Sequence, residues 1–191
     1  MGRGNMRKSR QEAADTMERI VNVAAREFNE GGIEGTGLAD IMTAAGLTHG
    51  GFYKHFSSKD QLVAEAVEQA LDRSLLSLEG FRGGRSLESI ATEYLSKQHR
   101  DEFEEACPLA SLGSELRFAE EETRDVASRG IERFISVIAA RFPKLPPREA
   151  KTKARGVVAA MVGGMMLSRI VTDSKLSDRF LRDTKNLIVQ S

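Results

Sequence analysis

A short polar segment between residues 48 and 54 carries side chains that are well suited to bind nucleic acid. Thr48 and Tyr53 offer hydroxyl groups, His49 an imidazole and Lys54 an ammonium group. Groups of these kinds donate hydrogen bonds to base edges and to phosphates, which together fix register and sequence preference on DNA. The segment indicates a DNA-binding surface if the surrounding chain holds these side chains outward.

The residues around this segment predict a helix, a glycine turn and a second, very short helix. Leu38, Ile41 and Met42 fall on one side of the first helix, and Gly46 ends it. Phe52 is expected to anchor the second helix from the inside, which leaves the polar side chains facing outward. This arrangement is the helix-turn-helix, which docks a short helix in the DNA major groove.

The same stretch resembles the DNA-binding domain of tetracycline-repressor-like (TetR family) transcriptional regulators. Three spaced elements carry the resemblance: Ala45-Gly46-Leu47-Thr48, then Phe52-Tyr53-Lys54-His55-Phe56, then Ser58-Lys59-Asp60-Gln61-Leu62. It extends over about residues 12 to 67, and beyond them the similarity is one of helical layout and length. Met42 departs from the family pattern by replacing a small alanine, and Gly51 by replacing a side chain that often reaches DNA.

The motif and the resemblance together predict a set of DNA-contacting residues. The candidates for base edges are Thr48, His49 and Lys54, and those that the resemblance assigns to the phosphate backbone are Tyr53, His55 and Lys59. The set is completed by Gly50 and Gly51, which allow close approach of the backbone, and by Thr36, which is also expected to cap the following helix.

Other roles stay open for several of these residues. Tyr53 and His55 could instead pack near Phe56, and Thr48 could serve only as a helix cap. Lys54 and Lys59 could be ordinary solvated lysines. The residues expected in the core of this domain are Phe28, Leu47, Phe52 and Phe56.

Charge is balanced over the chain and uneven at its start. The 191 residues contain 28 Lys plus Arg and 28 Asp plus Glu, so any DNA-binding surface must arise from local arrangement. Arg3, Arg7, Lys8 and Arg10 precede the first acidic residue, Glu12. This basic arm could follow phosphates or enter a minor groove, or it could be a disordered, solubilising N-terminus.

Cysteine usage and hydropathy predict a cytoplasmic protein. Cys107 is the single cysteine, which excludes an intramolecular disulfide and fits a reducing compartment. The N-terminal residues are polar and show no export signal. The longest nearly apolar run, residues 156–167, is too short to cross about 30 Å of hydrocarbon, so we expect no membrane partner.

Apolar periodicity predicts an all-α fold with two domains. Helices are expected over about residues 11–29, 58–78, 86–99, 123–142, 148–171 and 176–189, with a short one opening at Pro108. The breakers between them are the cluster at residues 80–85 and Pro143, Pro146 and Pro147. We predict a basic arm and three-helix DNA-binding domain over residues 1–58. Residues 59–191 are expected to form a helical effector-binding and dimerisation domain, whose connecting helix covers about residues 59–78.

The last two helices are expected to form a homodimer interface. The first of them is apolar almost all round between Val157 and Leu167, as a helix must be if it packs on its own core and on another subunit. The expected interface residues are Val157, Ala160, Met161, Gly164, Leu167, Phe180 and Leu187. A buried core helix in a monomer is the alternative.

The resemblance implies that the C-terminal domain binds a small-molecule effector, which we expect to be apolar or aromatic. The candidate pocket residues are Phe103, Cys107, Leu109, Leu112, Leu116, Phe118, Phe134, Ile138, Met161, Met165 and Met166. Each of them could instead be an ordinary core residue. Effector identity and operator sequence stay open.

Cys107 invites two further hypotheses. A helix N-terminus at Pro108 could lower the pKa of its thiol and make it a redox sensor, or the cysteine could be buried and inert. His99 and four nearby acidic residues suggest a metal or catalytic site, but they lack zinc-like spacing and a third catalytic group. We therefore expect no catalytic residue, metal or cofactor.

The sequence thus predicts a homodimeric, ligand-responsive regulator. It is expected to bind a palindromic double-stranded DNA operator, to repress transcription and to be released by its effector. The alternatives are a helical binding or adaptor protein without operator recognition, a thiol-sensing regulator, and a small helical enzyme that uses Cys107.

Overall fold

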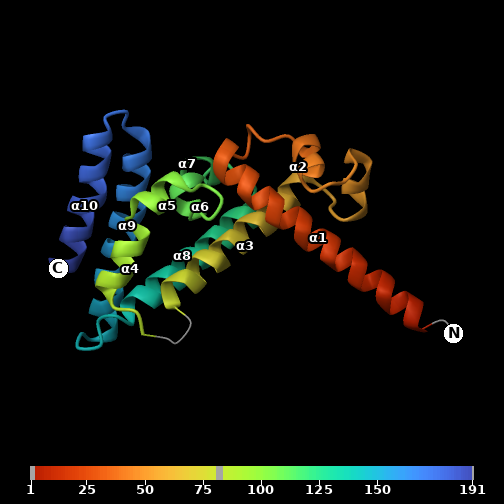
Figure 1. Cartoon of the computed structure of the whole chain (residues 1–191). Helices are drawn as coiled ribbons and strands as arrows, with labels where there is room; N and C mark the ends of the chain where they lie inside the picture. The colour runs from red at the N-terminus through yellow and green to blue at the C-terminus, as the bar shows by residue number, and fades with distance from the viewer. Residues whose placement is uncertain (1–2, 81–83, 191) are drawn as a thin grey trace.

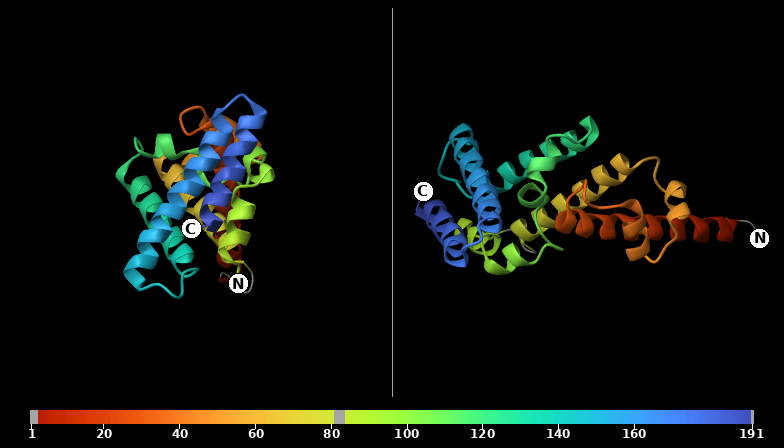
Figure 2. Two further views of the ribbon diagram at one scale, coloured as in Figure 1. Left: turned by 90° about the vertical axis from the view of Figure 1, so that its left-hand side faces the viewer. Right: turned by 90° about the horizontal axis from the view of Figure 1, so that it is seen from above.

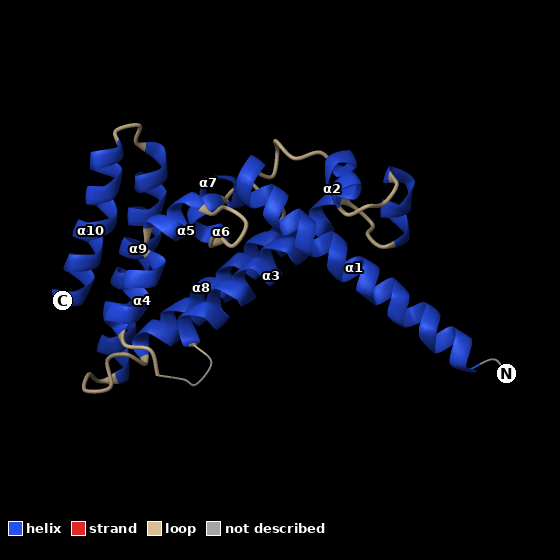
Figure 3. Ribbon diagram, viewed as in Figure 1, coloured by secondary structure: helices blue, strands red, loops and turns tan. Residues whose placement is uncertain are grey.

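The computed structural model describes residues 3–80 and 84–190, and every regular element within them is helical (Figures 1 and 3). The N-terminal elements are α1 (Arg3–Gly31), α2 (Leu38–Ala44), the 3-10 helix η1 (His49–Lys54) and α3 (Lys59–Glu79). The middle elements are α4 (Leu87–Tyr94), α5 (Lys97–Asp101), α6 (Pro108–Ser111) and α7 (Gly113–Leu116). The last are α8 (Glu121–Ala139), α9 (Pro147–Ile170) and α10 (Ser174–Gln190). The all-α prediction is confirmed.

Helix α1 begins earlier than its apolar pattern predicts. The pattern starts near residue 11, whereas the helical backbone runs from Arg3, so the basic arm is a helical extension rather than a disordered tail. From residue 11 onward, the first buried residue of α1 is Ile20, and the half of the helix before it projects away from the body of the molecule (Figure 1). Residues 5–30 include no Gly or Pro, so helix propensity and continuity with the packed half carry the helix back beyond the apolar pattern.

Helix α3 connects the two ends of the molecule, and its predicted start is confirmed. The Oγ of Ser58 accepts a hydrogen bond from the backbone N–H of Gln61 at 3.1 Å, while Gln61 Oε1 accepts from the N–H of Ser57 at 2.8 Å. Further along, α3 packs closely on α8. A Cβ at Gly130 of α8 would lie 2.6 Å from Cδ1 of Leu71, so the glycine allows this approach.

The middle of the chain is more broken than its periodicity predicts. The expected helix over residues 86–99 is two helices, because the chain turns at Leu95 and Ser96 then caps α5 by accepting from the N–H of His99 at 3.0 Å. Pro108 opens a helix as predicted, but α6 and α7 are each about one turn long. Gly80 ends α3 with a φ of 71°, and residues 81–83 of the predicted breaker cluster lie outside the described residues.

The C-terminal helices follow the predicted pattern closely. Pro146 and Pro147 stand at the start of α9, where a missing N–H costs nothing. Helices α9 and α10 lie side by side at the end of the molecule opposite the N-terminus (Figure 2). The Oγ of Ser177 donates to the carbonyl of Ser168 at 2.6 Å, and Gly164 admits Thr184 so closely that a Cβ would lie 2.7 Å from its Oγ1.

Candidate nucleic-acid interface and effector domain

The predicted helix-turn-helix is held by a small apolar core. Ile41 and Met42 of α2 and Phe52 of η1 are fully buried. The ring of Phe52 stacks on that of Phe56, with centroids 5.4 Å apart. Gly46 turns the chain between the two helices with a φ of 70°, a conformation that favours glycine. Because the apolar side chains point inward, the polar side chains of η1 must point outward.

The outward face of η1 presents the predicted donors to solvent. Thr48, His49 and Lys54 are exposed, and Tyr53 is 66% exposed. The ring of Tyr53 also meets Phe52 edge-on at 5.1 Å, so the side chain is braced at one side while its hydroxyl stays free to reach a partner. Thr48 occupies the N-cap position of η1, but its side chain makes no capping hydrogen bond.

The structure accommodates both departures from the family pattern, Met42 and Gly51. Met42 fills the space beneath η1, and a Cβ at Gly51 would touch its Cε at an ordinary 3.6 Å. Nothing lies within 4 Å of a Cβ at Gly50 among the described residues. The backbone of η1 is therefore open to close approach, and the specific donors lie on either side of the glycines.

Thr36 does not belong to this surface. It is only 6% exposed, and its hydroxyl donates to the carbonyls of Gly32 at 2.7 Å and of Glu27 at 3.1 Å. The N-cap of α2 is Gly37, which makes no side-chain capping bond. The predictions that Thr36 contacts DNA and caps α2 are both wrong, because its hydroxyl is used to close the loop after α1.

Lys59 is not an ordinary solvated lysine. Its Nζ donates to the carbonyl of Ile33 at 2.7 Å. The N–H groups of Ile33 and Glu34 in the same loop donate to Oε2 of Glu115 in α7, at 2.8 and 3.2 Å. The α1–α2 loop is therefore tied both to the start of α3 and to the C-terminal half. The sequence analysis missed Glu115, since nothing in its local pattern points to a contact so distant in the chain.

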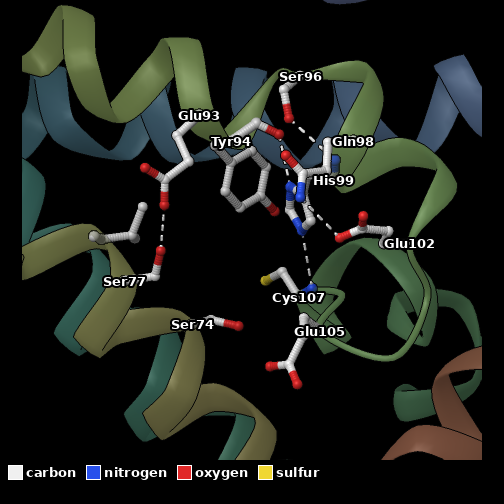
Figure 4. Close-up of a pocket in the computed structure, with 11 residues that line it drawn as sticks. Ser74, Ser77, Glu93, Tyr94, Ser96, Gln98, His99, Glu102, Glu105 and Cys107 are labelled. Atoms are coloured by element: carbon white, nitrogen blue, oxygen red, sulfur yellow. Dashed lines mark hydrogen bonds between the residues drawn. The ribbon is translucent and has the colours of Figure 1, made fainter.

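A small cavity, which we call the Tyr94 cavity, lies between α3, α4, α5 and the loop before α6 (Figure 4). Its volume is about 230 Å³. The hydroxyl of Tyr94 is buried beside the thiol of Cys107. Nδ1 of His99 lies 2.7 Å from the carbonyl of Tyr94, and Nε2 lies 3.2 Å from the N–H of Cys107. These contacts fit a neutral ring with its proton on Nδ1, and burial lowers the pKa of His99.

Cys107 lines this cavity but lacks the property expected of a thiol sensor. Its side chain is buried, and burial raises the pKa of the thiol, despite its position before α6. The structure thus favours the alternative of a buried cysteine over a thiol with a lowered pKa, because α6 is a single turn and desolvation outweighs the hydrogen bonds that favour the thiolate.

A larger opening, which we call the α8–α9 groove, has a volume of about 610 Å³. Its lining residues come from α6 to α9 and are Leu109, Gly113, Leu116, Arg117, Arg124, Ala127, Ser128, Ile131, Ile135, Arg155, Val158, Ala159 and Val162. Three of the predicted effector-binding residues border an opening: Cys107 the Tyr94 cavity, and Leu109 and Leu116 the groove.

The other predicted effector-binding residues line neither opening. Leu112, Phe134, Ile138, Met161 and Met165 are buried in the core. Phe103, Phe118 and Met166 are exposed or half-buried elsewhere. The periodicity that suggested a pocket therefore reflects packing between helices at these positions.

The predicted dimer residues divide between two faces of α9 and α10. Val157, Met161 and Gly164 are buried inside the protomer, so their assignment to an intersubunit surface is wrong. The exposed large apolar residues are Leu167 and Ile170 on α9 and Leu176, Leu187 and Val189 on α10. Ala160 and Phe180 are half-buried beside them. Ile170 and Leu176 were not predicted, although they extend the same helical stripes.

No group of three or more His, Cys, Asp or Glu side chains within the described residues could hold a metal ion. In the same part of the chain, no helix combines the length and apolar character needed to cross a membrane.

Comparison with known proteins relates both halves of the chain to one group. Residues 20–66 match the family described as "Bacterial regulatory proteins, tetR family", and residues 84–180 match "Transcriptional regulator LmrA/YxaF-like, C-terminal domain". The chain is 44% identical over 62 residues to the HTH-type transcriptional regulator AcrR of Shigella flexneri, covering 32% of this chain and 29% of that relative. It thus spans less than a third of the length of that relative.

Two further comparisons extend over most of the chain. The HTH-type transcriptional regulator LmrA of Bacillus subtilis is 27% identical over 168 residues, which cover 84% of this chain and 89% of LmrA. The crystal structure of a TetR-family regulator from Cytophaga hutchinsonii superposes with a TM-score of 0.77 at 20% identity, covering 94% of this chain and 96% of that chain. On these matches, the chain belongs to the TetR family of bacterial transcriptional regulators.

Proposed function

We propose that the protein is a homodimeric, ligand-responsive regulator that binds a palindromic DNA operator through η1 and represses transcription until an effector releases it. One observation carries the proposal: His49, Tyr53 and Lys54 face solvent together above the buried Phe52. In this proposal the protein works in the cytoplasm, where it meets DNA.

The position and chemistry of each exposed donor suggest which part of the DNA it contacts. His49 and Thr48 stand at the start of η1, the part of a recognition helix that reaches base edges. The hydroxyl of Tyr53 and the ammonium of Lys54 can reach phosphates or neighbouring base edges. The phosphate contacts would fix the position of η1 on the DNA, and the base contacts would give sequence preference.

The exposed stripe on α9 and α10 supports a homodimer. Leu167 is 43% exposed, and Ile170 and Leu187 are each 65% exposed. Nothing lies within 4 Å of a Cβ at Gly163 on the same face of α9 among the described residues, so another helix could approach closely there. A two-fold pairing of this surface would bury these side chains and place two copies of η1 on one operator.

The path from effector to DNA is supported by two contacts between the halves. Helix α3 starts beside η1 and lies along α8, where Gly130 admits Leu71. Glu115 holds the N–H groups of the α1–α2 loop. A ligand that shifts α7 or α8 would therefore move the reading unit, by which we mean α2 and η1. Adjacent half-sites lie about 34–36 Å apart, so a small pivot would penalise simultaneous docking of both protomers.

Selection of genomic fragments on the purified protein at near-physiological salt tests the proposal. The wild type is expected to enrich a few palindromic sites, and Lys54→Ala should lose them. Lys144→Ala, which removes an exposed lysine between α8 and α9, is the matched control and should keep them. Salt-sensitive binding without sequence preference would support the adaptor alternative instead.

A further inference from the structure

We infer that the α8–α9 groove binds an amphipathic organic anion, a molecule with an apolar body and one acidic group. The inference rests on the proposed function and deepens it, because it names the class of ligand that the effector domain takes. It sharpens the expectation of an apolar or aromatic effector by adding a negative charge.

The floor of the groove is apolar and large enough for a small organic molecule. Leu116, Ile131 and Ile135 line it from the α7 and α8 side, and Val158 and Val162 from α9. Its volume of about 610 Å³ falls within the usual range for small-molecule sites. Ile131 is 38% exposed although it is a large apolar residue, so a ligand in the groove would remove apolar surface from water.

The rim of the groove carries positive charge. Arg117 directly follows α7, Arg124 lies on α8 and Arg155 on α9, and the lining includes no acidic residue. Within residues 3–80 and 84–190, none of these arginines forms an ion pair with a carboxylate. Arg155 donates to Oγ1 of Thr152 at 3.0 Å, and Arg117 lies over the exposed ring of Phe118.

The arginines on the other side of α8 behave differently. Arg129 pairs with Glu68 of α3 at 3.9 Å, and Arg133 pairs with Asp72 of α3. The chain therefore supplies acidic partners where α8 meets α3 but none where α8 meets the groove. Guanidinium groups recognise carboxylates and other oxyanions through paired hydrogen bonds, so the rim is complementary to an anionic head group.

A second copy of the chain is a poorer occupant than a small ligand. Arg155, Val158 and Val162 lie on one face of α9, whereas Leu167 and Ile170 lie on average about a third of a turn away at 100° per residue. Dimerisation through the exposed stripe would leave the groove accessible. The floor of the groove also belongs to α8, whose opposite face meets α3 at Gly130. A ligand that displaces α8 would therefore displace α3 and, through it, the reading unit.

Isothermal titration with decanoate, below its micelle concentration, tests the inference on the full chain. Decanoate is expected to bind saturably and about tenfold more tightly than decanol or decyltrimethylammonium, since its carboxylate can meet the arginines. Each methylene removed from the chain should weaken binding by about fourfold. Equal affinity for decanoate and decanol, or no saturable binding, would overturn the inference.

Variants locate the site. Arg124→Gln/Arg155→Gln should weaken decanoate by about tenfold and leave decanol unchanged. Arg129→Gln, which makes the same change on the opposite face of α8, should match the wild type. Decanoate binding that survives the double variant but is lost in Tyr94→Phe would place the ligand in the Tyr94 cavity and refute the groove. Circular dichroism checks that each variant is folded.

Operator binding is measured separately, with and without decanoate. If DNA binds but decanoate does not, the inference fails and the proposed function stands. If decanoate binds but no DNA is selected, the proposed function fails while the ligand site stands.

Discussion

At the scale of single residues, the protein uses polar side chains to fix the loop that precedes its reading unit. Thr36 closes this loop on α1, and Lys59 binds its carbonyl at Ile33. From the sequence, both residues are predicted to contact DNA. Their hydrogen bonds to the backbone hold the loop that leads into α2 and η1, and we propose that the exposed residues of η1 form the DNA-binding surface.

Replacing Lys59 separates these two roles. Lys59→Ala is expected to lower the free energy of unfolding by about 1 kcal/mol, because the carbonyl of Ile33 loses its donor. Lys54→Ala should leave stability unchanged, since Lys54 is exposed. Urea unfolding of the three proteins measures this difference. An unchanged stability in Lys59→Ala, together with a reduced salt slope of DNA binding, would instead favour a direct phosphate contact.

His99 should make stability depend on pH. Its pKa is lowered by burial in the folded state, so the unfolded chain binds a proton first as pH falls below about 6.5. The stabilising contribution of the neutral ring is therefore present above that pH and is lost as pH falls through the lower, folded-state pKa. The bond from Cys107 N–H to Nε2 would be lost on protonation.

Thermal unfolding between pH 7 and pH 5 checks this prediction. The melting temperature of the wild type should fall more steeply over this range than that of His99→Gln, which cannot titrate. Parallel curves for the two proteins would show that His99 does not account for the pH dependence.

At the scale of elements, the contact between α3 and α8 joins the N-terminal helix-turn-helix to the C-terminal helices. Gly130→Ala should lower the free energy of unfolding by about 1–3 kcal/mol, because the new Cβ would lie 2.6 Å from Leu71. Gly113→Ala, at a position with no neighbour within 4 Å among the described residues, is the control. Chemical denaturation measures both, and Gly130→Ala/Leu71→Ala should cost less than the sum of the two single changes.

At the scale of the whole molecule, we propose that the exposed stripe of α9 and α10 forms the dimer interface. Leu167→Glu/Ile170→Glu is expected to convert the dimer to a monomer, because two buried charges would be unpaired in the interface. Leu76→Glu, which changes a leucine on α3 that is 67% exposed, should leave assembly unchanged. Sedimentation measures the mass, and a monomeric wild type at micromolar concentration would refute the proposed interface.

The monomeric variant should also lose operator affinity. A single η1 reads one half-site, so binding to the full palindrome should weaken by at least about a hundredfold when the second protomer no longer contributes. Unchanged affinity in a verified monomer would mean that the operator is read by one protomer at a time.

The sequence by itself determined the helical fold and the reading unit, because both depend on local patterns. Apolar spacing predicts α1, α3, α8, α9 and α10, and the cap at Ser58 predicts where α3 begins. Gly46 and Phe52 are sufficient to orient η1, since one turns the chain and the other anchors it. These signals lie within a few residues of the feature that they predict.

Only the tertiary structure decided which apolar and polar residues face a partner. Met161 and Leu167 have similar sequence environments, yet one is buried against the protomer core and the other is exposed. Glu115 meets Ile33 from a distant part of the chain, and the α8–α9 groove gathers Arg117, Arg124 and Arg155 from separate segments. Burial and charge pairing depend on which helices pack together, and that packing is a property of the whole chain.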